Sequence, residues 1–180
     1  MKYFIADTHF YHEAIIEFSK RPFQDVADMN KQLIENWNSV VKSPQDEVYI
    51  LGDFLYKGNG EQANQILKQL RGKKYLIKGN HEKYLNDENF DSPLIDWVKD
   101  YYTFEYNKRK FILFHYPILE WEGYYNRAIH LYGHVHHTRD EYFRSVLGNY
   151  AMNVGVDMID YKPISIDDVI RIVNTREMSW

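Results

Sequence analysis

The sequence contains no cysteine among its 180 residues. This absence excludes a disulfide scaffold, a cysteine-ligated zinc module, a thioredoxin-like site and a thiol nucleophile. No stretch approaches the roughly 20 apolar residues that a membrane-spanning helix needs. The apolar run after Met1 meets Asp7 too early to form the centre of a signal peptide. We therefore expect a cytoplasmic protein that does not associate with a membrane.

The sequence also lacks an excess of positive charge. Its 22 Lys and Arg residues stand against 26 Asp and Glu residues, which gives a net charge of −4. This balance does not indicate nucleic-acid binding, although it leaves room for a local basic groove. The apolar fraction of 44% is that of a globular protein. Because we find no linker, low-complexity tract or repeat, we expect residues 1–180 to form a single domain. Nothing in the sequence indicates an oligomeric state.

The apolar pattern alternates between short strands and helices in the first half of the chain. It predicts strands over residues 3–6, 48–51 and 74–78, and helices over residues 12–18, 27–41 and 61–70. Such alternation favours an α/β fold with parallel strands. The second half predicts a hairpin of residues 101–106 and 110–115, strands over 130–132 and 150–156, and a helix over 164–173. Polar residues follow each of the first three strands, at the edge where α/β sheets bind ligands.

Five short motifs supply these polar residues. They are Asp7-Thr8-His9, Gly52-Asp53, Gly79-Asn80-His81-Glu82, His115-Tyr116-Pro117 and Gly133-His134-Val135-His136. With 9 Gly and 8 His in the chain, chance produces G-N-H or G-H-x-H only about 0.03 times or less each. Carboxylate, imidazole and amide oxygen together suit divalent Mn, Fe, Zn or Ni. One carboxylate at a strand end can bridge two cations, so the motifs predict a site for two metal ions.

The ordered set D-x-H, G-D, G-N-H-[D/E], H and G-H-x-H resembles the calcineurin-like metallophosphoesterases, in particular their small single-domain prokaryotic and phage members. The resemblance implies a four-layer α/β/β/α sandwich with two mixed β-sheets. It also implies that the two metal ions share Asp53. One ion would take Asp7, His9 and His136, and the other would take Asn80, His115 and His134. Manganese is favoured over iron, zinc and nickel as the metal.

The resemblance further implies an enzyme, a metal-dependent hydrolase of phosphoric esters. A hydroxide shared by the two metals would attack phosphorus, and His81 would protonate the leaving oxygen as a general acid. Glu82 replaces the Asp that the family usually has after G-N-H, and it would orient His81 through a hydrogen bond. The second acid and the arginine of the protein phosphatases are absent after Gly52-Asp53. We therefore do not expect a phosphoprotein phosphatase. The favoured activity is that of a phosphodiesterase rather than a phosphomonoesterase, acting on small or nucleotide phosphoesters.

Five further residues are candidate substrate contacts, and each has a simpler alternative. They are His12, Lys57, Trp121, Arg127 and His137. The two histidines lie within three residues of a predicted ligand, yet either could be an ordinary loop residue. Lys57 and Arg127 could instead be solvated side chains on the surface. Trp121 could stack against a base, but packing within its own loop or in a dimer contact is the slightly favoured alternative. We assign His130 to the hydrogen-bonded core.

Two other functions are compatible with the same motifs. One is a non-catalytic, metal-binding interaction module, a use to which the retromer scaffold subunit puts this fold. The other is a nuclease on short nucleic acids. A module tolerates the loss of ligands and of the catalytic histidine, whereas all seven predicted ligands and His81 are present here. Completeness of the set therefore favours catalysis.

Overall fold

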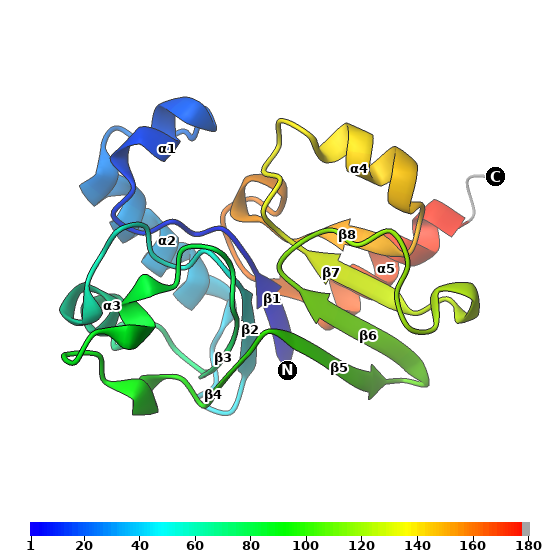
Figure 1. Ribbon diagram of the computed structural model, residues 1–180, viewed down its shortest axis with the longest axis horizontal. Helices are drawn as coiled ribbons and strands as arrows, with labels where there is room; N and C mark the ends of the chain where they lie inside the picture. Colours follow the sequence, from blue (N-terminus) through cyan, green and yellow to red (C-terminus); the bar gives the residue numbers. More distant parts are fainter. Residues whose placement is uncertain (178–180) are drawn as a thin grey trace.

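The computed structural model describes residues 1–177 and contains two mixed β-sheets that pack face to face (Figure 1). The first sheet has the order β4-β3-β2-β1-β9. Its strands are β1 (Lys2–Ile5), β2 (Glu47–Leu51), β3 (Lys73–Ile77) and β4 (Trp97–Lys99), which are parallel, and β9 (Ile164–Ser165), which is antiparallel to β1. The second sheet, β5-β6-β7-β8, consists of β5 (Tyr101–Tyr106), β6 (Arg109–Phe114), β7 (Ile129–Tyr132) and β8 (Ala151–Asn153). Only the β5–β6 pair is antiparallel there.

Helices cover the outer sides of the two sheets and complete the four-layer sandwich. Helices α1 (Glu13–Phe18), α2 (Val26–Val40) and α3 (Gly60–Leu67) lie on the side of the first sheet, and α4 (Asp140–Leu147) and α5 (Ile166–Glu177) lie on the side of the second (Figure 1). Four short 3₁₀ turns connect these elements: η1 (Lys83–Asn86), η2 (Ser92–Leu94), η3 (Tyr124–Asn126) and η4 (Val156–Met158). None of the helices within residues 1–177 is long and apolar enough to cross a bilayer.

A row of aromatic rings forms the interface between the sheets. Phe4, Tyr49, Tyr75 and Trp97 are register partners across four neighbouring strands of the first sheet. They face Tyr102, Phe104 and Phe111 of the second sheet, with ring centroids 5.7 Å apart for Tyr49–Phe104 and 6.3 Å apart for Phe4–Phe111. Such rings bury large apolar areas and favour offset stacking. These seven aromatic side chains therefore hold the two sheets together.

Local sequence signals account for several element boundaries. Asp25 caps α2 by accepting a hydrogen bond from the backbone N–H of Asp28, and Asn59 forms a capping box with Gln62 at α3. Asn107 and Lys108 both have positive φ angles at the β5–β6 turn, as a tight two-residue hairpin requires.

Two expected element boundaries were wrong, and two elements were not predicted. The strand expected over 150–156 ends at Asn153, because Val154 and Val156 instead exchange backbone hydrogen bonds with Ala6 of the other sheet. The helix expected from residue 164 begins at Ile166, because Ile164 and Ser165 pair with β1. Strand β4 was not predicted because its three residues are too few to show a period. Helix α4 was not predicted because the exposed apolar residues Tyr142 and Val146 obscure its amphipathic pattern.

Candidate metal centre

The five motifs meet where the carboxyl ends of the two sheets join. The chain after β1 runs beside the chain after β2, with hydrogen bonds from Asp7 N–H to the Gly52 carbonyl and from His9 N–H to the Asp53 carbonyl. Within the second sheet, the Gly133 N–H donates to the His115 carbonyl. This sheet is attached to the end of β1 by backbone hydrogen bonds that Ala6 forms with Val154 and Val156. The sheet topology therefore brings the candidate ligands, from Asp7 to His136, to one edge, as expected for ligands at strand ends.

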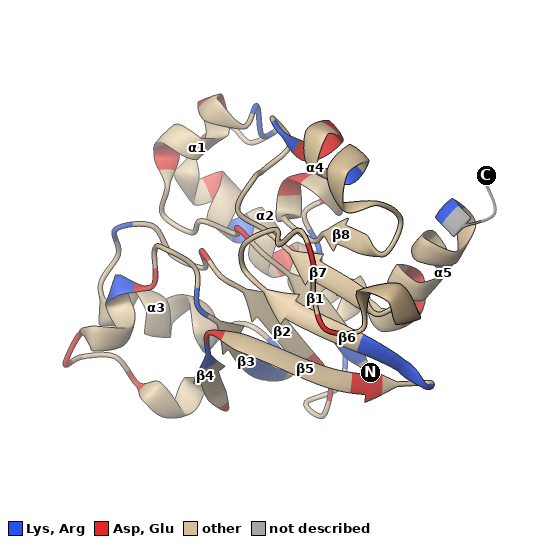
Figure 2. Ribbon diagram, turned by 45° about the vertical axis from the view of Figure 1, so that its right-hand side comes forward, with Lys and Arg blue, Asp and Glu red and all other residues tan. Residues whose placement is uncertain are grey.

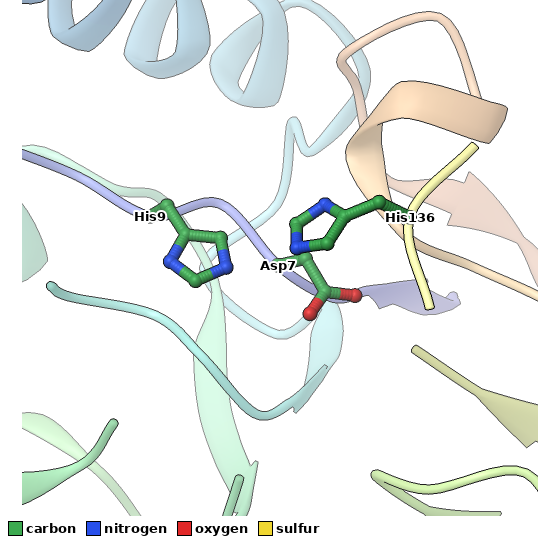
Figure 3. A group of neighbouring side chains, drawn as sticks. All are labelled: Asp7, His9 and His136. Atoms are coloured by element: carbon green, nitrogen blue, oxygen red, sulfur yellow. The ribbon is translucent and has the colours of Figure 1, made fainter. Parts of the chain in front are cut away.

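The first group of candidate ligands consists of Asp7, His9 and His136. Their ligand atoms lie within 4.8 Å of one another, and Figure 3 shows the carboxylate beside the two imidazole rings. The rings of His9 and His136 have centroids 5.1 Å apart. Both ring nitrogens of His9 are buried without a hydrogen-bond partner. Orphaned polar atoms of this kind are costly in a protein interior, and a coordinated divalent cation satisfies them.

The second group consists of Asp53, His115 and His134, whose ligand atoms also lie within 4.8 Å of one another. Asp53 connects the two groups, because its Oδ2 lies 3.6 Å from Nε2 of His115 and 3.6 Å from Nε2 of His9. Its other oxygen, Oδ1, accepts hydrogen bonds from the backbone N–H groups of Asn80 and His81. One oxygen of the carboxylate is thus fixed and the other faces the imidazoles of both groups.

Asn80 lies beside the second group. Its side-chain Oδ1 is 3.2 Å from Nε2 of His115 and is also approached by the hydroxyl of Tyr116. The Asn80 residue is exposed, whereas His115 is fully buried. The amide oxygen therefore lies at the solvent-facing side of this group.

The backbone of the site is conformationally strained. Five of the seven predicted ligands have positive φ angles between 46° and 71°, namely Asp7, His9, Asp53, His134 and His136. A left-handed conformation in a residue other than glycine costs about 1–3 kcal/mol and concentrates at functional sites. The backbone strain turns these side chains toward a common point. Surrounding hydrogen bonds hold the backbone in the strained conformation.

Two motif glycines leave space for ligands of other motifs. A Cβ atom on Gly79 would collide with Oδ1 of Asp53, and a Cβ atom on Gly133 would collide with Oδ2 of Asp7. The glycines of G-N-H and G-H-x-H therefore accommodate the carboxylates of G-D and D-x-H. Pairwise contacts between motifs explain why these short patterns occur together.

The electrostatics of the site favour cations. Burial, reinforced by the neighbouring charges of Asp53 and Asp157, raises the pKa of Asp7 to about 8. Burial lowers the pKa values of His9, His115 and His134, which keeps these imidazoles neutral and able to coordinate. The raised pKa of Asp7 means that burial disfavours its ionised form, and a divalent cation beside it would offset that cost and favour the carboxylate. The two His/Asp groups accordingly fit a dinuclear metal site.

An open cavity of about 330 Å³ lies over both groups. His81 lines it beside the ligands, with its side chain 31% exposed and its Nε2 3.9 Å from Oδ2 of Asp53. The remaining walls come from α1 and from the segment after β2: His12, Ala14, Ile15, Phe18 and Tyr56. The cavity thus gives solvent and small molecules access to the face of the metal groups that His81 borders.

The hydrogen bond expected between Glu82 and His81 is not among those of the described residues. The Glu82 carboxylate instead accepts hydrogen bonds from the backbone N–H groups of Phe54 and Gly79. Glu82 is buried, and burial together with the charge of Asp53 raises its pKa to about 7. The additional methylene of Glu over Asp lets the carboxylate reach across to the chain after β2. Glu82 therefore joins the loops that carry Asp53 and Asn80.

Trp121, a candidate substrate contact, packs within its own loop, which is the alternative that the sequence slightly favoured. Its indole N–H donates to the Ala128 carbonyl, and its ring packs against Tyr124 and His130 in a small core outside the cavity. The packing alternative is the one realised, because the indole satisfies its only donor within its own loop. His130 is fully buried with both ring nitrogens hydrogen bonded, as assigned from the sequence.

The other four candidate contacts are distributed unevenly. His12 lines the cavity and stacks on Tyr56, with ring centroids 3.5 Å apart. Lys57 lines an adjoining surface pocket instead, with its Nζ over the Tyr56 ring. Neither Arg127 nor His137 lines the cavity. Arg127 is exposed at the end of η3, and Nδ1 of His137 is buried without a partner.

Sequence reasoning missed four residues that belong to this region. Tyr56 and Phe18 line the cavity, and Arg21 and Asp157 form a buried ion pair that reaches His136. No local motif marks any of them. Arg21 was interpreted only as part of the Arg21-Pro22 helix stop. Only the tertiary structure brings Asp157 to the site, from 21 residues beyond His136.

Comparison with known proteins agrees with this geometry. The sequence profile described as calcineurin-like phosphoesterase matches residues 3–159. The chain belongs to this family. It is 39% identical over 176 residues to an uncharacterized protein of Methanocaldococcus jannaschii, with 95% of this chain and 90% of that protein covered. The crystal structure of a protein of unknown function from Aquifex aeolicus is similar to this calcineurin-like phosphoesterase, with a TM-score of 0.76, 31% identity, and coverage of 96% of this chain and 98% of that one.

Proposed function

We propose that the protein is a phosphodiesterase that uses two divalent metal ions, with Mn²⁺ as the favoured metal, to hydrolyse small or nucleotide phosphoesters. The observation that carries this proposal is the position of Asp53, whose free carboxylate oxygen lies within 4 Å of Nε2 of His9, His81 and His115. Asp7, His9 and His136 would hold one ion, and Asn80, His115 and His134 the other, with Asp53 shared. When bound, two such ions polarise a phosphoryl oxygen and lower the pKa of a water between them.

His81 is the residue of this chain best placed to move a proton. Its imidazole is partly exposed at the cavity while its backbone N–H is fixed to Asp53 Oδ1. We assign to it the donation of a proton from its ring to the leaving oxygen of the ester. Glu82 supports this indirectly, because it fixes the backbone of Gly79 at the start of the G-N-H segment.

The cavity wall favours a diester over a monoester. No Lys or Arg is among the described residues that line it, whereas Ala14, Ile15 and Phe18 give it an apolar side. A phosphomonoester carries up to two negative charges and gains from further cations. A phosphodiester carries one charge and presents a second organic group, which the apolar side can contact.

The distribution of charge does not favour a nuclease. In the described part of the chain, basic and acidic residues are interspersed along the ribbon (Figure 2). A run of three basic residues, Lys108 to Lys110, lies at the β5–β6 turn, at the opposite end of β6 from His115. An extended polynucleotide would need a continuous basic track leading into the cavity.

The proposal is tested by comparing Mn²⁺-dependent hydrolysis of bis(p-nitrophenyl) phosphate and p-nitrophenyl phosphate. We expect diester cleavage in the wild type and a loss of about 10²–10⁴-fold in kcat for His81→Ala, with both metal ions retained. The exposed Asp160→Asn variant serves as a control that keeps full activity. Binding of two metals without cleavage of either ester would favour the non-catalytic interaction module instead.

A further inference from the structure

A buried arginine lies behind the first metal group without being a ligand of it. The guanidinium of Arg21 has no exposed surface, although the residue comes from the short segment between α1 and α2. Its Nη2 donates to the Asp7 carbonyl at 2.8 Å, and its Nη1 donates to the Thr8 carbonyl at 2.9 Å. These two carbonyls belong to the strained chain that turns the Asp7 and His9 side chains toward each other. The arginine therefore holds the backbone of two of the three candidate ligands.

The same guanidinium also reaches the third ligand through Asp157. Nε of Arg21 donates to Oδ1 of Asp157 at 2.9 Å, and the other carboxylate oxygen lies 2.8 Å from Nδ1 of His136. With the proton of His136 on Nδ1 and donated to this carboxylate, its Nε2 lone pair is left for coordination. The Arg21 side chain thus contacts the backbone of Asp7 and Thr8 and the carboxylate that binds His136.

We propose that Arg21 and Asp157 are positioning residues that set the metal affinity of the group formed by Asp7, His9 and His136. This inference rests on the proposed function only in that the group binds a metal ion. A rigid, planar fork of donors is needed to reach two carbonyls and a carboxylate at once, which a lysine ammonium cannot reproduce. Breaking a buried ion pair from one side also leaves the other charge uncompensated.

The histidines of the second metal group do not share this support. Nδ1 of His115 contacts the Leu51 carbonyl at 2.7 Å, and His134 is exposed. No hydrogen bond or ion pair recorded for the described residues connects Arg21 or Asp157 to either histidine. Disruption of the Arg21–Asp157 pair should therefore weaken one metal site and spare the other, which distinguishes positioning from general destabilisation.

The experiment is isothermal titration of the metal-stripped, folded full chain with Mn²⁺. For wild type we expect two binding events. For Asp157→Asn and for Arg21→Lys we expect one event weakened by about 10–100-fold, the range typical for loss of a ligand's hydrogen-bonding partner, and the other unchanged. The two substitutions lie on different segments, so that one remains informative if the other fails to fold. Repetition in a His134→Ala background, which leaves the first group as the only intact one, should show the same loss on the single remaining event.

The matched control is Asp46→Asn. Asp46 is also a buried aspartate that accepts backbone hydrogen bonds, from Lys42 and Ser43, but it precedes β2 at the end of the sheet opposite the metal groups. We expect this variant to lose thermal stability and keep both binding events. Equal weakening of both events in Asp157→Asn, or unaltered binding in both Arg21 and Asp157 variants, would overturn the inference. A wild type that binds two ions but cleaves no ester would refute the proposed function and leave this inference standing.

Discussion

The two candidate metal groups differ in burial and in the way they are held. In the first, Asp7 and His9 are buried, and a guanidinium and a carboxylate fix the ligands from behind. In the second, Asp53 and His115 are equally buried, but His134 is exposed. His115 contacts the Leu51 carbonyl and the side-chain oxygen of exposed Asn80. Preorganised ligands bind a metal more tightly because less conformational freedom is lost on binding. We therefore predict that an ion in the first group would exchange more slowly than an ion in the second group, which includes exposed His134.

Substitution of the shared residue Asp53 should have the largest effect, because it removes the carboxylate that the two groups have in common. Asp53→Asn removes the charge that serves both groups, and we expect activity to fall by at least about 10³-fold, in line with the loss of a principal catalytic group. We also expect weaker binding of both ions in equilibrium dialysis followed by elemental analysis. Retention of two tightly bound ions would show that Asp53 does not link the groups.

The motif glycines allow the groups to be separated. Gly133→Ala places a methyl group against Asp7 and should cost the first ion alone, whereas Gly79→Ala acts on Asp53 and should weaken both. Gly148→Ala is the matched control, because its Cβ would meet nothing within 4 Å although its φ of 76° makes the substitution strained. Metal content per chain after dialysis distinguishes the three variants. Equal metal content in the Gly79 and Gly133 variants would contradict the assignment of carboxylates to groups.

His130 differs from the candidate ligand histidines, because both of its ring nitrogens form hydrogen bonds within the protein. Burial lowers its pKa to about 4. Because the unfolded chain takes up a proton near the ordinary pKa of 6.5, stability is complete above that pH and is lost as pH falls toward 4. The loss is about 3 kcal/mol.

Removal of the titrating ring tests this assignment. We expect His130→Gln to be less stable at pH 7 but to show a flatter dependence of its unfolding free energy between pH 6.5 and 4. Urea unfolding with excess chelator measures this, since the ligand histidines then contribute equally to both curves. Curves that remain parallel would assign the acid sensitivity to other groups.

The smallest expected effect concerns the substrate side of the cavity. Phe18 is 64% exposed and its ring meets His136 edge-on. We expect Phe18→Ala to lower kcat/KM for bis(p-nitrophenyl) phosphate by about 3–10-fold, as for loss of one apolar contact, with p-nitrophenyl phosphate and metal content unaffected. An equal loss on both esters would argue against an apolar subsite for the second ester group.

The strand ends and the grouping of the candidate ligands are predictable from the sequence because local patterns mark both. Short apolar runs followed by D-x-H, G-N-H and G-H-x-H are enough to identify the edge of the sheet. Residues that act across the fold carry no such pattern. Glu82 follows His81 in the chain yet binds Phe54 and Gly79, and Asp157 reaches His136 only through η4. Trp121 lies between two ligands in sequence, but its indole is satisfied within its own loop.

The joining of both sheets at the metal groups has a kinetic consequence. Asp7 and His9 extend from the first sheet, and His136 follows β7 of the second, so an ion in this group ties the sheets together. Separation of the aromatic interface during unfolding then requires release of that ion. Bound metal should act chiefly on the unfolding rate and prolong the lifetime of the folded chain, while refolding, which must dock both sheets before the ligands meet, proceeds at nearly its metal-free rate.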